Sequence, residues 1–399
     1  MVCLFQCLFL LAATTATTAT IVTPPITPTT SMKNYLAPLN ITLEKHFVTT
    51  DDGYILLVHR LANPQRPVVF LQHGILASSW CWIANTPESA LGIVLHRAGY
   101  DVWMGNNRGN AFSVNHTHLK PHSREFWNFT FDDMGKHDLP AMISATLALS
   151  NQTKLNLIAW SQGNTQTFIA GSDSKVGPKL HDSIKLWIAL SPVSFLYDST
   201  STLISLMSRF HLADILEDVF PYGILQGGPA LSALETFLCK VTLGELCKLS
   251  VDLICGVSNA DSTSSLERLT AHFPAGCSVK DLDHYQQFID APIFAEFNYG
   301  EEGNIREYGK RTPPSYNLTN FNRYGTRGGG GMQVALFAAG NDDLVNSKDI
   351  ERLLAELPPD VIHSNNFYDG FSHVTWMVGT TAAFQKWGGD VLSLLENFS

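Results

Sequence analysis

The alternation of strand-like runs with helix-like stretches constrains the fold of this chain more than any other feature. The strand-like runs are mostly apolar or alternating, and they cover residues 54–61, 67–72, 100–104, 155–160, 184–190, 332–338 and a run near Val361. The stretches of helical spacing cover residues 89–98, 138–149, about 162 onward, 347–357 and 380–396. Strands that alternate with helices build parallel sheets, so the sequence predicts an α/β fold with a mainly parallel central sheet.

The alternation breaks between about residues 197 and 296. This segment holds apolar stretches of helical spacing, a Gly-Gly-Pro turn and four cysteines, but no convincing central strand. Because the alternation resumes after it, we interpret it as a helical cap or lid inserted into the sheet domain. The expected organisation is a core in two parts, residues 46–196 and 297–399, with the cap at residues 197–296 between them.

The N-terminal segment has the composition of a targeting sequence. Val2 to Ala13 is a short apolar run followed by small residues, and the first charged side chain is Lys33. A membrane span needs about 20 apolar residues, so this run is too short for a transmembrane anchor and resembles a secretory signal peptide. We expect a signal peptide at residues 1–19, a Thr/Pro-rich lead-in outside the fold at residues 20–45, and a secreted or lysosomal protein.

Asn-x-Ser/Thr sequons agree with passage through the secretory pathway, although each tripeptide alone is a weak signal. We expect glycosylation at their asparagines. These are Asn40, Asn115, Asn128, Asn151, Asn317 and Asn397.

The cysteines after the signal segment are odd in number: Cys81, Cys239, Cys247, Cys255 and Cys277. In an oxidising compartment, the four in the cap predict one or two disulfides with at least one thiol left over. The alternative is that they are buried free thiols. A zinc site is disfavoured because the segment has no CxxC pair, so we expect no metal.

Charge argues against a nucleic-acid partner. The formal net charge is -10, and no cluster of Lys or Arg occurs along the chain. Phosphate neutralisation needs such clusters. With 45% hydrophobic and 16% charged residues, the chain instead has enough apolar material for a sizeable core.

The pentapeptide at residues 159–163 (AWSQG) indicates a nucleophile. It lies directly between a predicted strand and a predicted helix. In a nucleophile elbow, a sharp strand-to-helix turn with small flanking residues exposes a serine above the sheet. This placement predicts that Ser161 is a nucleophile, whereas the five letters alone would fit an ordinary serine after a strand.

A serine nucleophile in this fold is followed along the chain by an acid and then by a histidine. Asp342 comes just past a predicted strand, and His373 lies in a glycine-containing loop before the last helix. The competing candidates are Asp343 and His363, of which His363 falls within or beside a strand. We expect His373 to act as general base and Asp342 to fix its tautomer, so that Ser161 forms an acyl-enzyme that water hydrolyses.

The tetrahedral intermediate of such a reaction needs hydrogen-bond donors for its oxyanion. The expected donors are the backbone N–H groups of Gln162, directly after the nucleophile, and of Ile75, after an early strand that ends in His73 and Gly74. A His-Gly pair by itself would be an ordinary strand-ending turn.

Longer stretches extend this pattern beyond the site. They are residues 50–60 (TDDGYILLVHR), 70–79 (FLQHGILASS), 100–110 (YDVWMGNNRGN), 125–140 (EFWNFTFDDMGKHDLP), 160–163 (WSQG), 189–193 (ALSPV), 274–279 (PAGCSV) and 340–342 (GND). With these stretches the chain resembles the acid lipase family, which includes lysosomal acid lipase and gastric lipase. The resemblance runs, with gaps, from about Phe47 to Gly379.

The resemblance implies an α/β-hydrolase core with a helical cap and lid, acting on neutral lipid esters. It maps the catalytic roles to Ser161, Asp342 and His373, and the oxyanion donors to Ile75 and Gln162. We expect no cofactor.

The resemblance also implies a cap disulfide between Cys239 and Cys247, which leaves Cys255 free. The chain departs from the family at Ala159 and Trp160, where the elbow usually reads Gly-His. It departs again two residues after the histidine, where the family usually has Asp.

The expected function is hydrolysis of triacylglycerols or sterol esters at a lipid–water interface. One alternative is a carboxylesterase that acts on soluble short-chain esters. Another is a catalytically silent hydrolase-fold protein that binds lipid, which the large indole of Trp160 beside the nucleophile would favour and an intact set of Ser161, Asp342 and His373 would not.

Overall fold

The structure is a computed structural model that describes residues 25–201, 223–224, 245–325 and 331–399. This part of the chain contains a nine-stranded sheet of order β1-β2-β4-β3-β6-β7-β8-β9, with β5 paired to β2. The strands are β1 (Leu43–Thr49), β2 (Tyr54–Leu61), β3 (Val68–Gln72), β4 (Asp101–Met104), β5 (Asn115–His116), β6 (Leu155–Trp160), β7 (Ile184–Leu190), β8 (Gln333–Ala339) and β9 (Ile362–Tyr368).

The centre of the sheet is parallel. From β4 through β3, β6, β7 and β8 to β9, every neighbouring pair runs parallel. The antiparallel pairs involve β1, β2 and β5 at one edge. The predicted α/β fold with a mainly parallel sheet is therefore confirmed.

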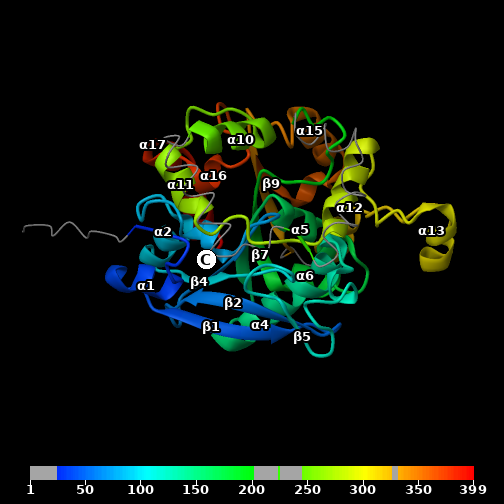
Figure 1. The fold of residues 1–399 in the computed structure, drawn as a ribbon, viewed down its shortest axis with the longest axis horizontal. Helices are drawn as coiled ribbons and strands as arrows, with labels where there is room; N and C mark the ends of the chain where they lie inside the picture. The colour runs from blue at the N-terminus through cyan, green and yellow to red at the C-terminus, as the bar shows by residue number, and fades with distance from the viewer. Residues whose placement is uncertain (1–24, 202–222, 225–244, 326–330) are drawn as a thin grey trace, which may run out of the picture.

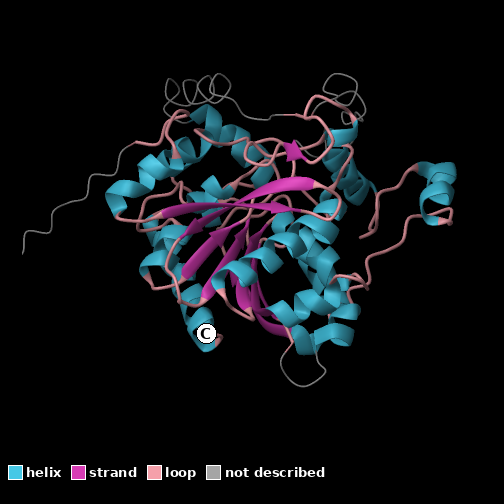
Figure 2. Ribbon diagram, turned by 90° about the horizontal axis from the view of Figure 1, so that it is seen from below, coloured by secondary structure: helices cyan, strands magenta, loops and turns pink. Residues whose placement is uncertain are grey.

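Helices cover both faces of this sheet, as two perpendicular views show (Figure 1, Figure 2). The described α-helices before β7 are α1 (Met32–Leu36), α2 (Leu91–Arg97), α3 (Phe131–Asp133), α4 (Leu139–Ser150), α5 (Gln162–Ser172) and α6 (Gly177–Ser183). Those after β7 are α10 (Glu245–Cys255), α11 (Thr263–Thr270), α12 (Val279–Asp290), α13 (Gly300–Tyr308), α14 (Asn320–Gly325), α15 (Ser347–Glu356), α16 (Thr375–Val378) and α17 (Thr381–Asn397). Five short 3-10 or π turns are Ala37–Leu39, Ser79–Trp82, Glu125–Trp127, Met134–Asp138 and Pro359–Val361.

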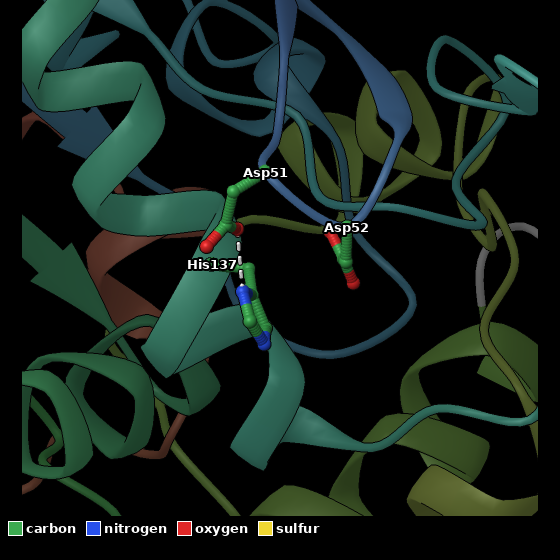
Figure 3. Close-up of side chains that lie close together, drawn as sticks. All are labelled: Asp51, Asp52 and His137. Atoms are coloured by element: carbon green, nitrogen blue, oxygen red, sulfur yellow. Dashed lines mark hydrogen bonds and ion pairs between the residues drawn. The ribbon is translucent and has the colours of Figure 1, made fainter.

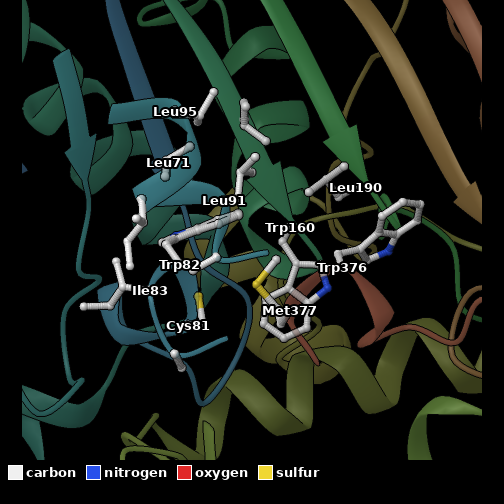
Figure 4. Packing of buried hydrophobic residues seen from close by; sticks show 14 of the residues in the cluster. Leu71, Cys81, Trp82, Ile83, Leu91, Leu95, Trp160, Leu190, Trp376 and Met377 are labelled. Carbon is white, nitrogen blue, oxygen red and sulfur yellow. The ribbon is translucent and has the colours of Figure 1, made fainter. Parts of the chain in front are cut away.

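Two hydrophobic cores form, one on each face of the sheet. In β3, Leu71 joins one core and its neighbour Phe70 joins the other; Ile158 and Leu157 divide in the same way in β6. Successive strand side chains point to opposite faces, so a sheet covered on both sides needs apolar residues at every position. Figure 4 shows the first of these cores around Leu71.

The chain joins the core earlier than the expected start at residue 46. Helix α1 buries Tyr35 and Leu36, and the Tyr35 ring lies 6.1 Å from that of Trp80. The expectation that residues 20–45 lie outside the fold is wrong, because Ile26 within the Thr/Pro-rich run and the apolar residues of α1 are all buried in one core. The expected signal peptide at residues 1–19 lies outside the described residues.

The six sequon asparagines are all exposed, as glycosylation would require. They stay predictions of modification. Among the helices that the structure describes, none is both long and apolar enough to cross a bilayer.

Cys81, Cys255 and Cys277 are buried free thiols. Burial raises the pKa of all three, so these thiols stay protonated and unreactive at neutral pH. Cys239 and the side chain of Cys247 lie outside the described residues, and the disulfide between them stays a prediction.

Candidate active site

Ser161 lies in a strained turn between β6 and α5. Its φ of 54° and ψ of -122° fall in a region that residues with a side chain rarely adopt, at a cost of about 1–3 kcal/mol. Two glycines make room for the turn. A Cβ on Gly74 would lie 2.9 Å from the Ser161 Cβ, and one on Gly163 would lie 2.5 Å from the carbonyl oxygen of Gln72. This sharp turn places Ser161 just beyond the end of β6, as the pentapeptide predicts.

The structure brings Ser161, His373 and Asp342 together. The Nε2 atom of His373 lies 2.8 Å from Ser161 Oγ, and its Nδ1 atom lies 2.8 Å from Asp342 Oδ2. These residues come from the β6–α5 turn, the loop after β9 and the loop after β8, and all three are buried. One imidazole nitrogen can thus accept the serine proton while the carboxylate holds the N–H of the other.

Asp342 is fixed by its own loop. Its Oδ1 atom accepts hydrogen bonds from the backbone N–H groups of Leu344 and Val345, which leaves Oδ2 free for the histidine. The neighbouring Asp343 faces elsewhere and accepts a hydrogen bond from Thr200 Oγ1.

The rejected histidine candidate is also placed. His363 is exposed on β9, and its ring contacts that of Phe398 with centroids 5.1 Å apart. It takes no part in the cluster around Ser161.

The loop after β3 carries the first expected oxyanion donor, Ile75. The carbonyl of Gly74 accepts a hydrogen bond of 2.7 Å from His73 Nδ1. Because the C=O and N–H of a trans peptide point in opposite directions, the Ile75 N–H is turned away from His73. The Nε2 atom of His73 accepts hydrogen bonds from the Asn107 backbone and the Asn110 side chain. Burial lowers the pKa of His73 to about 4, so the ring is neutral and stays fixed.

The second expected donor is the Gln162 N–H, in the first turn of α5, where backbone N–H groups lack a helical acceptor. Within the described residues, neither this group nor the Ile75 N–H donates to another protein atom. The Gln162 side chain is held by a hydrogen bond to Asp281 of α12. Both N–H groups are therefore available to a ligand beside Ser161.

Trp160 supports the histidine loop and does not block the nucleophile. Its indole N–H donates a hydrogen bond of 3.0 Å to the carbonyl of His373, and its ring lies 5.9 Å from the imidazole. In Figure 4 it lies beside Met377 in the same core as Trp376. The indole thus fills space under the site.

A cavity of about 380 Å³ opens at Ser161 and His373. Helices α10 and α11 supply one wall. Apart from Ser161 and His373, the residues that line the cavity, including those of α10 and α11, are almost all apolar. They are Ile75, Leu76, Trp160, Val251, Ile254, Cys255, Leu266, Leu269, Thr270, Phe273, Pro274, Leu344 and Val374. Such a cavity suits a hydrocarbon chain better than a polar substrate.

Comparison with known proteins decides the family. Residues 32–86 match a model described as a partial alpha/beta-hydrolase lipase region, and residues 67–368 match the alpha/beta hydrolase fold. The chain is 36% identical over 367 residues to gastric triacylglycerol lipase of Bos taurus, covering 88% of this chain and 87% of that protein. It is 34% identical over 368 residues to lysosomal acid lipase/cholesteryl ester hydrolase of Rattus norvegicus, covering 89% and 88%. The chain belongs to the α/β-hydrolase lipases.

The resemblance expected from the sequence is thereby confirmed, and this lipase is a carboxylic ester hydrolase. A solved carboxylesterase structure from Nitrososphaera gargenis shares the fold with a TM-score of 0.51 at 12% identity, covering 88% of this chain and 100% of that one. At that identity the likeness shows the fold alone.

Sequence reasoning missed the residues that form hydrogen bonds to the side chains and loops of the lipase site. The sequence indicates His73 only as the end of the strand before the Ile75 donor, and it gives His73's partners Asn107 and Asn110 no role. The polar run at residues 105–110 directly after a buried strand was the available signal. Asp281 in α12 and Asp261 between α10 and α11 have no local sequence signal at all.

A separate polar group forms where the β1–β2 turn meets the π turn Met134–Asp138. The side chains of Asp51, Asp52 and His137 bring potential metal-binding atoms within 4.8 Å of one another (Figure 3). His137 Nδ1 lies 2.6 Å from Asp51 Oδ1, and both oxygens of Asp52 accept hydrogen bonds from Arg108. All three side chains thus have partners within the protein.

Proposed function

We propose that this lipase hydrolyses carboxylic esters of neutral lipids, triacylglycerols or sterol esters, through an acyl-enzyme on Ser161. The observation that carries the proposal is the hydrogen-bonded series Ser161–His373–Asp342 at the mouth of an apolar cavity. The names of the relatives, a triacylglycerol lipase and a cholesteryl ester hydrolase, support the same substrate class.

In the proposed reaction, His373 takes the proton of Ser161 as its oxygen attacks the ester carbonyl carbon. The Ile75 and Gln162 N–H groups stabilise the oxyanion, and Asp342 stabilises the imidazolium. The imidazolium then protonates the departing alcohol, which leaves the acyl group on the serine. Water, deprotonated by His373, attacks this acyl-enzyme, and the imidazolium returns the proton to Ser161 Oγ as the bond to the fatty acid breaks.

The rest of the chain fits a secreted or lysosomal lipase. We propose residues 197–296 as the cap, because the described helices α10 and α11 within it form a wall of the cavity. The exposed sequons support glycosylation in the secretory pathway.

Labelling with a fluorophosphonate tests the nucleophile. The wild-type protein should be labelled at one serine, and Ser161→Ala should not be labelled, because the probe reacts only with an activated hydroxyl. Other serines lack the oxyanion donors of this site. Loss of a single donor already costs about 100- to 1000-fold in rate, so labelling of the other serines should be negligible. Equal labelling of both proteins would exclude Ser161.

A comparison of two substrates separates a lipase from a soluble esterase. The rate of hydrolysis of long-chain triacylglycerol should rise sharply once its concentration passes the solubility limit and an emulsion forms. The rate on p-nitrophenyl butyrate, which stays dissolved, should rise smoothly with concentration. Activity confined to the dissolved ester would favour the esterase alternative.

A further inference from the structure

The loop that carries His373 is bound on both sides by a single carboxylate from the cap. Asp261 lies in the connector between α10 and α11, residues 256–262. One of its carboxylate oxygens accepts a hydrogen bond of 2.7 Å from Ser372 Oγ, and the other accepts one of 2.5 Å from Thr375 Oγ1. The two hydroxyl donors flank His373 in sequence, and both residues are buried.

The same connector holds the backbone of the histidine loop. The His373 N–H donates to the carbonyl of Cys255, where α10 ends, at 3.0 Å. Ser258 Oγ donates to the carbonyl of Gly370 at 2.6 Å. Inside the loop, the Ser372 N–H donates to Thr375 Oγ1 at 2.8 Å, so the hydroxyl that Asp261 holds also closes the turn around the histidine.

The connector is tied to the acid loop as well. The side chain of Asn341 donates to the carbonyl of Val257 at 3.0 Å. Gly256 has a φ of 89°, and a Cβ there would lie 1.9 Å from the Asn341 carbonyl oxygen. The connector can approach Asn341, the residue before Asp342, this closely only because residue 256 is glycine.

We propose that Asp261 is a positioning residue for the reaction, holding His373 at the angle from which it bonds both Ser161 and Asp342. This inference rests on the proposed role of His373 as the base. Hydrogen bonds to an ionised acceptor are about twice as strong as neutral ones, so the carboxylate restrains the loop better than a hydroxyl would. Asp261 does not line the cavity, and its two side-chain hydrogen bonds go to residues on either side of His373, so we expect it to act through the histidine loop.

A swap of the two side chains tests the proposal with p-nitrophenyl butyrate. Asp261→Thr should lower kcat about 10- to 100-fold and change KM less than about twofold, because displacing a catalytic group by about 1 Å costs on that order. Thr375→Asp alone should also lower kcat, since it places two carboxylates face to face. The double variant Asp261→Thr/Thr375→Asp restores one carboxylate between the hydroxyls and should recover kcat to within about fivefold of wild type.

Asp252→Asn is the matched control, because Asp252 is a cap carboxylate paired with Lys248 on α10. It should leave kcat unchanged. Active-site titration with fluorophosphonate corrects every rate for the fraction of folded enzyme. Asp261→Asn removes the same negative charge as Asp261→Thr with a smaller change of side-chain shape.

The proposal is overturned if Asp261→Thr keeps the wild-type kcat per titrated site, or if the double variant, once corrected, is as slow as the single ones. A purely structural role would lower the titrated fraction and leave the corrected kcat unchanged. Failure of the proposed function gives a different result, namely a Ser161→Ala protein that still hydrolyses the ester.

Discussion

At the scale of single residues, the departures from the family pattern are absorbed by contacts that stabilise the site. Trp160 fills the space beside the nucleophile and donates to the His373 carbonyl, so the large indole does not argue for a silent protein. Thr375 lacks the carboxylate expected two residues after the histidine, and Asp261 brings one to that point from the cap.

Asp281 makes the stability of the protein depend on pH. It is fully buried, and this burial raises the pKa of its carboxyl to about 7, although Gln162 and the Phe131 N–H lower it by donating hydrogen bonds. In the unfolded chain the same group titrates near pH 4. Between about pH 4 and pH 7 the folded state therefore holds a proton that the unfolded state has lost, so this group's contribution to stability falls as pH rises through that window.

Asp281→Asn should remove this dependence. As pH rises from 4 to 8, the free energy of unfolding of the variant should increase relative to that of wild type. The full difference of about three pKa units between the folded and unfolded states corresponds to roughly 4 kcal/mol. Thermal melting of both proteins across that range measures the difference. A gap in Tm that stays constant with pH would show that the carboxyl does not change its protonation in the folded state.

At the scale of elements, α10 has two apolar faces with different surroundings. Val251 and Ile254 line the cavity, whereas Leu249 and Leu253 are exposed by 55% and 44%. An exposed apolar stripe beside a substrate cavity fits contact with a lipid surface.

Leu249→Ser/Leu253→Ser should weaken action on lipid particles and spare action on dissolved esters. Burying a leucine in an apolar phase is worth about 2 kcal/mol, so adsorption to an emulsion should weaken at least about tenfold. Hydrolysis rates on emulsified triacylglycerol and on p-nitrophenyl butyrate provide the comparison. An equal loss on both substrates would place these leucines in the fold of the cap instead of at the interface.

At the scale of the whole molecule, a buried arginine joins the antiparallel edge of the sheet to the chain around α4. Arg108 pairs with Asp138 and Asp52, and its guanidinium lies 4.0 Å from the Tyr54 ring centroid. Asp138 is completely buried. The pairs therefore connect the β1–β2 turn, the loop after β4 and the start of α4.

Removing only the arginine should destabilise the whole protein. Arg108→Met leaves Asp138 buried without its partner, which costs roughly 3–5 kcal/mol. Removing both charges, in Arg108→Met/Asp138→Leu, should restore much of that loss, since no uncompensated charge stays buried. Urea denaturation of the three proteins measures the free energies of unfolding, and a double variant no more stable than the single one would contradict the electrostatic cause.

Although it does not indicate β1 or β5, the sequence alone indicates the alternation of the other seven strands with helices, the parallel sheet, the elbow at Ser161 and the general position of its proposed acid and base. These features follow from residue periodicity and from turns a few residues long, which a local window contains. It placed the start of the fold too late, because the Thr/Pro-rich composition hid the apolar residues of α1.

The packed structure places Asp342, and not Asp343, beside His373, orients the Ile75 N–H through His73, and sets Asp261 against the histidine loop. The Asp261–Thr375 hydrogen bond joins residues 114 positions apart. Such a contact depends on how the cap packs on the sheet, and the packing is a property of the assembled cores, which no single stretch of sequence contains.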